Sequence, residues 1–122
     1  IGNADMHLKN WSLLYPDRST PVLSSAYDLV STLPYIPGDE LALGFGGSRS
    51  LSEITPDRVR RFADTARLPA SPLWKIVTET TDRTVAAWEK LAEKGLLSEK
   101  MCGIIGGQIL AVAKTVVRAT GK

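Results

Sequence analysis

The 122-residue chain carries 15 basic and 13 acidic side chains, a formal net charge of +2, and 43% hydrophobic residues. These values are typical of one globular domain and exclude a disordered chain, and so small a charge does not by itself indicate nucleic-acid binding. The single cysteine, Cys102, excludes an internal disulfide and fits a reducing compartment. No apolar run approaches the roughly 20 residues that span a bilayer, and no signal peptide is visible. We therefore expect a soluble, cytoplasmic protein with no membrane partner.

Residues 1–10 predict a loop that delivers polar side chains to one point. Asp5 and Asn10 stand five positions apart, and Asp28 follows 18 positions after Asn10. A phosphoryl-transfer site needs parts in this order: a carboxylate that accepts the proton of the attacking hydroxyl, then an amide oxygen and a second carboxylate for magnesium. The catalytic loop of protein kinases has the same interval between its Asp and Asn. The spacing alone is far more typical of a solvated turn than of a catalytic loop, because Asp and Asn are common turn residues.

The next segment predicts a β-hairpin. Trp11 to Tyr15 is a short apolar run closed by a turn at Pro16-Asp17, and Val22 to Ser25 indicates the returning strand. Such a hairpin would bring Asp28 beside Asn10, as shared metal coordination requires.

An irregular stretch with two prolines and a glycine spans Leu33 to Gly38. Leu41 to Phe45 then predicts another short strand, with a turn at Gly46-Gly47. The glycines match neither a Gly-x-Gly-x-x-Gly loop nor a P-loop, so they do not replace the phosphate-covering loop of a kinase.

Three helices are expected after Leu51. Thr55-Pro56-Asp57 is a start signal, with a side-chain cap, a proline in the first turn and an acid near the positive helix end. Ser71-Pro72 repeats this signal, Gly95 predicts a stop, and Ser98 predicts the cap of the last helix. The apolar stripes of the three helices consist of Val59, Phe62, Ala63 and Ala66; of Leu73, Val77, Thr84, Trp88 and Leu91; and of Met101, Ile105, Ile109, Val112 and Val116.

Four arginines lie off the first stripe: Arg58, Arg60, Arg61 and Arg67. They could contact DNA phosphates or an acidic partner, or form a solvated helix face. Gly103, Gly106 and Gly107 are costly inside a helix, so we expect close approach of a neighbouring helix. Cys102 has no companion for metal ligation and is interpreted as a small buried apolar residue.

Two strings carry a family resemblance: Gly-Asn-Ala-Asp-Met-His-Leu-Lys-Asn, residues 2–10, and Ala-Tyr-Asp-Leu-Val-Ser, residues 26–31. In this order they closely resemble signatures of the HipA family of toxin serine/threonine kinases, and residues 41–47 with Ile54-Thr55 resemble that family's next segment. The resemblance implies Asp5 as catalytic base and Asn10 and Asp28 as magnesium ligands. It also implies nucleotide contacts from His7, Lys9, Asn10, Tyr27 and Asp28. The alternatives are a structural role for His7, a surface position for Lys9 and a core position for Tyr27.

The expected fold is α+β and mostly α, with a small β-hairpin region packed on a bundle of about three helices. We expect residues 1–122 to be the C-terminal portion of a HipA-like kinase domain, with the catalytic and metal-binding region in 1–50 and the helical region in 51–122. The phosphate-binding lysine and covering loop of an N-terminal lobe would be missing. The isolated chain is then expected to be inactive and prone to self-association.

The resemblance implies ATP- and Mg²⁺-dependent phosphorylation of a protein serine or threonine within a bacterial toxin–antitoxin system linked to persistence. The implied partners are the N-terminal lobe, a DNA-binding antitoxin and a protein substrate such as an aminoacyl-tRNA synthetase or another translation factor. One alternative is a non-catalytic module that binds an antitoxin or DNA through the arginine-bearing helix. Another is a helical domain that only supports the missing lobe.

Overall fold

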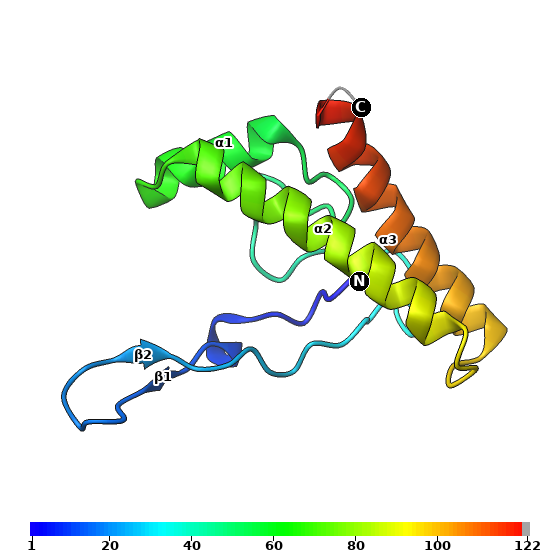
Figure 1. Cartoon of the computed structure of the whole chain (residues 1–122), viewed down its shortest axis with the longest axis horizontal. Coiled ribbons are helices and arrows are strands. Elements are labelled where there is room, and N and C mark those ends of the chain that lie inside the picture. Colours follow the sequence, from blue (N-terminus) through cyan, green and yellow to red (C-terminus); the bar gives the residue numbers. More distant parts are fainter. Residues whose placement is uncertain (121–122) are drawn as a thin grey trace.

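The computed structural model describes residues 1–120, with side chains through Arg118. Within this range the elements follow the order η1 (Leu8–Asn10, a 3-10 helix), β1 (Leu13–Leu14), β2 (Val22–Leu23), α1 (Pro56–Ala66), α2 (Ala70–Ala92) and α3 (Glu99–Thr120). Figure 1 shows the β1–β2 hairpin projecting away from the helices. The prediction of a mostly helical α+β fold is confirmed.

The core lies between the helices, where α2 packs against both α1 and α3. Val59 and Ala63 of α1 are buried, as are Ile105, Ile109 and Val116 of α3. Their spacing keeps one apolar side of α1 and of α3 turned inward, as the stripes predict. No residue of α2 is fully buried, and Leu91 of its predicted stripe is exposed. Phe62 is partly exposed, but its ring stacks on Phe45 at a centroid distance of 4.9 Å. This contact ties the loop before α1 to the helix.

Two helix starts follow the sequence signals. Thr55 Oγ1 accepts the N–H of Arg58 at 3.3 Å, and Ser98 Oγ accepts the N–H of Met101 at 3.3 Å. The start of α2 differs from the prediction, because the helix begins at Ala70 after an extended Pro69, and Ser71 lies inside it. Pro72 remains in the first turn of α2, where its missing N–H leaves no helical hydrogen bond unmade.

The β1–β2 hairpin is confirmed, with Leu13 opposite Leu23 and Leu14 opposite Val22. These four apolar side chains are all exposed. The strand predicted over Leu41–Phe45 is wrong: the segment forms only an isolated bridge between Phe45 and Ser48. The residues that pair with it lie directly after it in the chain: the N–H of Leu41 donates to Arg49 O at 2.8 Å. The segment therefore closes a local loop and does not add to a sheet.

The turn at Gly46-Gly47 is present, and both glycines have positive φ, at 55° and 81°. A Cβ on Gly46 would collide with the backbone of Arg58 at the start of α1. Glycine therefore allows the turn to lie directly against the helix.

Helix α3 bears on the expectation that the chain has no membrane-spanning segment. Over Glu99–Arg118 its mean hydropathy of 1.4 makes it the one helix among residues 1–120 that is long and apolar enough to cross a membrane. Glycines, Gln108, Lys114 and Thr115 interrupt its apolar residues, so the sequence shows no continuous apolar run of that length. This signal is weak evidence of a membrane span, because the core helix of a soluble protein passes the same test. Ile105, Ile109 and Val116 pack inside the chain, while 22% of the apolar window as a whole is buried.

Candidate active site

Hydrogen bonds at η1 close the N-terminal loop, residues 1–10, on itself. The N–H of His7 donates to Asp5 O at 2.9 Å and to Asn10 Oδ1 at 3.1 Å. The N–H of Asn10 donates in return to His7 O at 3.0 Å. These bonds hold Asp5, His7 and Asn10 together in one compact turn.

The β1–β2 hairpin returns the chain to this loop. Asn10 Nδ2 donates to Asp28 Oδ2 at 2.7 Å, so the expected proximity of these side chains is confirmed. The backbone of Asp28 has φ of 56°, in the left-handed region that Asp tolerates better than most other L-residues. An amide and a carboxylate therefore converge at one point.

Asp5 lies beside His7. His7 Nε2 and Asp5 Oδ1 are 3.0 Å apart, and both side chains are about half exposed. The imidazole thus orients one oxygen of a carboxylate that stays accessible to solvent. His7 braces Asp5, which agrees with the structural alternative for this residue, while contact with a nucleotide stays a prediction.

Asn3 connects the two halves of this arrangement, and the sequence analysis did not single it out. Its Oδ1 accepts the N–H of Asp5 at 3.1 Å, and its Nδ2 donates to the carbonyl of Asp28 at 3.4 Å. Thr32 was missed as well: its hydroxyl accepts the N–H of Ala4 and donates to Gly2 O, both at 3.3 Å. The position of Asn3 inside the quoted string, two residues before Asp5, was the available signal.

The side chain of Tyr27 contacts the backbone of Lys9. The phenol of Tyr27 donates to Lys9 O at 3.0 Å and lies 2.7 Å from Ser12 Oγ, so it braces the hairpin against η1. The ring is partly exposed and is not a core residue. Lys9 is exposed, and its ammonium has no ion pair with another group in the described part of the chain.

Asn10 and Asp28 provide the oxygen ligands that Mg²⁺ prefers. Within residues 1–120, no three or more His, Cys, Asp and Glu side chains gather as a metal cluster. A magnesium ion would thus meet one protein carboxylate and one amide here, with phosphate and water oxygens completing its shell, as is usual for Mg²⁺ on nucleotides. The convergent pair fits that role, although Asn10 Oδ1 currently accepts the N–H of His7.

The four arginines in α1 and directly after it, where Arg67 follows the last helical residue with φ of 55°, do not act as one group. Arg58 donates to Gly46 O and to Glu53 Oε2, each at 3.1 Å, and Arg60 pairs with Asp57 at 3.3 Å. Within the described residues no salt bridge involves Arg61 or Arg67, and both are exposed. Two of the four are therefore satisfied within the chain.

Comparison with known proteins gives consistent results. A family model described as the HipA-like C-terminal domain matches residues 1–88. A Sinorhizobium fredii protein named as a candidate kinase, Y4dM, is 50% identical over 95 residues, which are 77% of this chain and 23% of that protein. A second one from the same organism, Y4mE, is 33% identical over 94 residues, covering 76% of this chain and 22% of its own length.

A solved structure is also similar over nearly the whole chain. The complex of HipA, HipB and operator DNA from the Shewanella oneidensis MR-1 toxin–antitoxin system contains a chain that matches 98% of this one, with a TM-score of 0.69 and 27% identity. The match covers 28% of that chain, so this chain spans only about a quarter of the proteins it resembles. With a family model covering more than half of its residues, the chain belongs to the HipA-like C-terminal domain family.

Proposed function

We propose that this chain is the catalytic C-terminal part of a HipA-like serine/threonine kinase that transfers the γ-phosphoryl group of ATP to a protein hydroxyl. The observation that carries the proposal is the convergence of Asn10 with Asp28 next to Asp5, with Asn3 bonded to both Asp5 and Asp28. The carboxylate proposed as the base and the pair proposed to hold the metal thus lie on one scaffold. The names of the curated relatives support the same class of reaction.

In the proposed reaction, the acceptor oxygen forms a bond to the γ-phosphorus while its proton passes to the Asp5 carboxylate. The bond from the γ-phosphorus to the bridging oxygen breaks, and its electron pair leaves with ADP. His7 holds Asp5 in position through its 3.0 Å contact. Asn10 and Asp28 would hold Mg²⁺, which neutralises phosphate charge when bound. Lys9 would add positive charge near the transferring group.

The proposed kinase activity is tested by comparing two purified proteins. One is this chain, and the other is a chimera in which it replaces the matching 95-residue segment of the 50% identical Sinorhizobium relative. With ATP and Mg²⁺, we expect serine or threonine phosphorylation by the chimera and no turnover by this chain alone, because phosphoryl transfer also needs a phosphate-binding lysine and a covering loop.

The variants Asp5→Asn and Asp28→Asn should lower the rate by a factor on the order of 100 or more, because general-base catalysis and metal binding supply at least that much. The variant Asp82→Asn, an exposed carboxylate on α2, is the matched control. Full activity of Asp5→Asn would disprove the assigned base.

A second function is antitoxin or DNA contact through α1. It is supported by exposed Arg61 and Arg67 and by the complex of the Shewanella neighbour with HipB and operator DNA. Such contact weakens steeply as salt rises, and each lost phosphate contact reduces the salt slope by about one. For binding of operator DNA by the chimera, with and without HipB-type antitoxin, the salt slope should therefore fall by about one in Arg61→Gln and in Arg67→Gln and stay unchanged in Asp5→Asn.

The intact kinase is further proposed to be a cytoplasmic toxin whose substrate is an aminoacyl-tRNA synthetase or another translation protein. Phosphoproteomics of cells that express the chimera, compared with its Asp5→Asn variant, tests this identity.

A further inference from the structure

A cavity of about 480 Å³ opens beside Asp5. Asp5 and His7 form one wall, and the segment from Ile36 to Arg49 forms the other, with Asp39, Glu40 and Arg49 in the lining. Neither Asn10 nor Asp28 lines this cavity. The proposed base therefore faces a space separate from the proposed metal pair, and a hydroxyl group can reach Asp5 from there without crossing the phosphate side.

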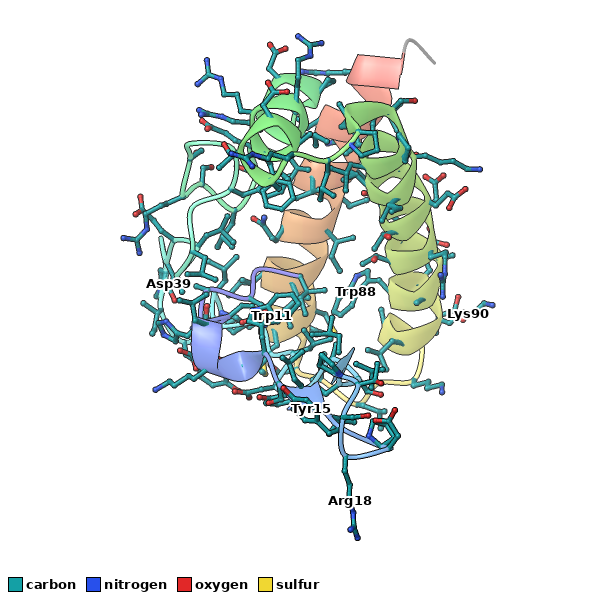
Figure 2. All side chains as sticks on the ribbon, turned by 90° about the vertical axis from the view of Figure 1, so that its left-hand side faces the viewer. Trp11, Tyr15, Arg18, Asp39, Trp88 and Lys90 are labelled. Atoms are coloured by element: carbon teal, nitrogen blue, oxygen red, sulfur yellow. The ribbon has the colours of Figure 1, made fainter. Side chains whose placement is uncertain are left out.

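The far wall of the cavity is acidic. Asp39 is half-buried, and its Oδ1 accepts the N–H of Glu40 at 3.0 Å. No salt bridge involves Asp39 within residues 1–120. Figure 2 shows Asp39 on the side of the molecule that carries η1.

The single arginine of the cavity is already engaged. Arg49 Nε donates to Leu41 O at 2.8 Å and lies 3.8 Å from Glu40 Oε2. The cavity thus carries three carboxylates, from Asp5, Asp39 and Glu40, against one guanidinium. Asp39 keeps a carboxylate oxygen without a cationic partner, in a concave site that carries more negative than positive side chains.

We propose that this cavity receives the residues that flank the acceptor serine or threonine, and that Asp39, assisted by Glu40, selects substrates with a lysine or arginine close to that hydroxyl. This inference rests on the proposed kinase function. It follows from the position of Asp5 in the wall of the cavity, since an acceptor hydroxyl within hydrogen-bond reach of Asp5 brings its neighbours along the acidic wall.

The test uses the chimera with ATP and Mg²⁺ and nine-residue peptides that carry a central serine in an alanine–glycine background. One lysine, or one glutamine as the uncharged control, is placed in turn at each flanking position. We expect lysine at one or two positions to raise kcat/KM about tenfold over glutamine, in the range of hydrogen bonds to charged groups. The variant Asp39→Asn should remove most of this difference by raising KM for the lysine peptide while leaving kcat unchanged.

Two further variants sharpen the result. Asp39→Lys should reverse the preference, so that a glutamate peptide becomes better than the lysine peptide. Asp57→Asn makes the same charge change on exposed α1, outside the cavity, and should keep the lysine preference. Equal kcat/KM for the lysine and glutamine peptides at every position would overturn the inference and leave the kinase function intact.

Direct binding separates a failure of the inference from a failure of the kinase function. The best lysine peptide, or a lysine-scanned mixture where no peptide is phosphorylated, is titrated into this chain by NMR. Shifts of the Asp39 and Glu40 amide signals with the lysine peptide, and their absence with the glutamine peptide, are expected. Lysine-selective shifts in this chain, together with no phosphorylation of any peptide by the chimera, would reject the kinase function. Shifts of equal size with the lysine and the glutamine peptide would reject the role of Asp39.

Discussion

The side chains of Asn10 and Asp28 meet at 2.7 Å although 17 residues of a projecting hairpin separate them. The hairpin has only two paired residues on each strand and exposes apolar side chains on both faces, so its own packing is weak. Its base is held instead by polar contacts, from Asn10 to Asp28 and from Tyr27 to Lys9 and Ser12. The stability of the hairpin and the geometry of the candidate metal pair are therefore coupled.

Metal binding is the first prediction. Titration of this chain with Mn²⁺ and ATP, followed by NMR, should selectively broaden amide signals near Asn10 and Asp28, because Mn²⁺ occupies oxygen sites that suit Mg²⁺. The variant Asp28→Asn should lose most of the broadening while the helical signals stay unchanged. Broadening in Asp28→Asn equal to that of the original chain would show that another group holds the metal, and Asp82→Asn, on exposed α2, serves as the control.

The site and the fold differ in how much of each the sequence could predict. The hairpin followed from turn residues between two apolar runs, and the pairing of Asn10 with Asp28 followed from the hairpin. The roles of Thr55 and Ser98 followed equally from local rules, because a helix cap depends on neighbouring residues only.

Longer-range contacts were not predictable in this way. No strand forms at Leu41–Phe45, because a strand needs a partner strand and this segment bonds to Ser48 and Arg49, which follow it directly in the chain. The bond from Asn3 to Asp28 joins residues 25 positions apart, and no local pattern specifies it. The acidic wall at Asp39 also depends on how the irregular segment folds back on Asp5, which sequence periodicity does not describe.

The glycines of α3 give the second prediction. A Cβ on Gly106 would lie 2.8 Å from Trp88 Nε1, and Figure 2 shows Trp88 reaching from α2 toward α3, whereas Gly103 has open space. Gly106→Ala should lower the free energy of unfolding by about 1–3 kcal/mol through overpacking. Gly103→Ala, one turn away, should raise it by about 0.5–1 kcal/mol through helix propensity. Denaturant unfolding measures both, and equal effects would contradict the contact between α2 and α3.

Helix caps give the third prediction. Thr55→Ala removes the side-chain acceptor for the N–H of Arg58 and should destabilise the chain by about 1 kcal/mol. Ser71→Ala should be neutral or slightly stabilising, because Ser71 lies inside α2 and alanine is the better helix former. Urea unfolding of the two variants discriminates the observed start of α2 from the one predicted by sequence, for which Ser71→Ala would cost as much as Thr55→Ala.

Acid stability gives the fourth prediction. The hydroxyl of Ser48, and secondly the guanidinium of Arg58, lower the pKa of Glu53 from its usual 4.5. A carboxyl whose pKa is lower in the folded state stabilises the fold above about pH 4.5 and loses this contribution as pH falls through the folded value. Unfolding free energy should thus fall less steeply below pH 4.5 in Glu53→Gln and in Ser48→Ala than in the original chain. Hydrogen bonds from Thr20 and Ser19 lower the pKa of Asp17 in all three proteins and cancel in the comparison.

The fifth prediction concerns Asn3, which accepts the N–H of Asp5 and donates to the carbonyl of Asp28. Because it touches both halves of the candidate site without being a proposed ligand or base, it acts as a positioning residue. In the chimera, Asn3→Ala should lower kcat about tenfold, a typical effect of a loosened catalytic group. KM for ATP should change far less.

The control for Asn3 is Gln108→Ala. Gln108 Nε2 donates to Leu51 O at 2.8 Å, so the variant also removes one amide-to-backbone hydrogen bond, but one that involves neither Asp5 nor Asp28, although Gln108 Cγ lies beside Gly2. Both variants should lose about 1 kcal/mol of stability, and only Asn3→Ala should lose kcat. A parallel loss of kcat in both would mean that activity simply follows stability. An unchanged kcat in Asn3→Ala would mean that Asp5 and Asp28 are held by the hairpin and η1 alone.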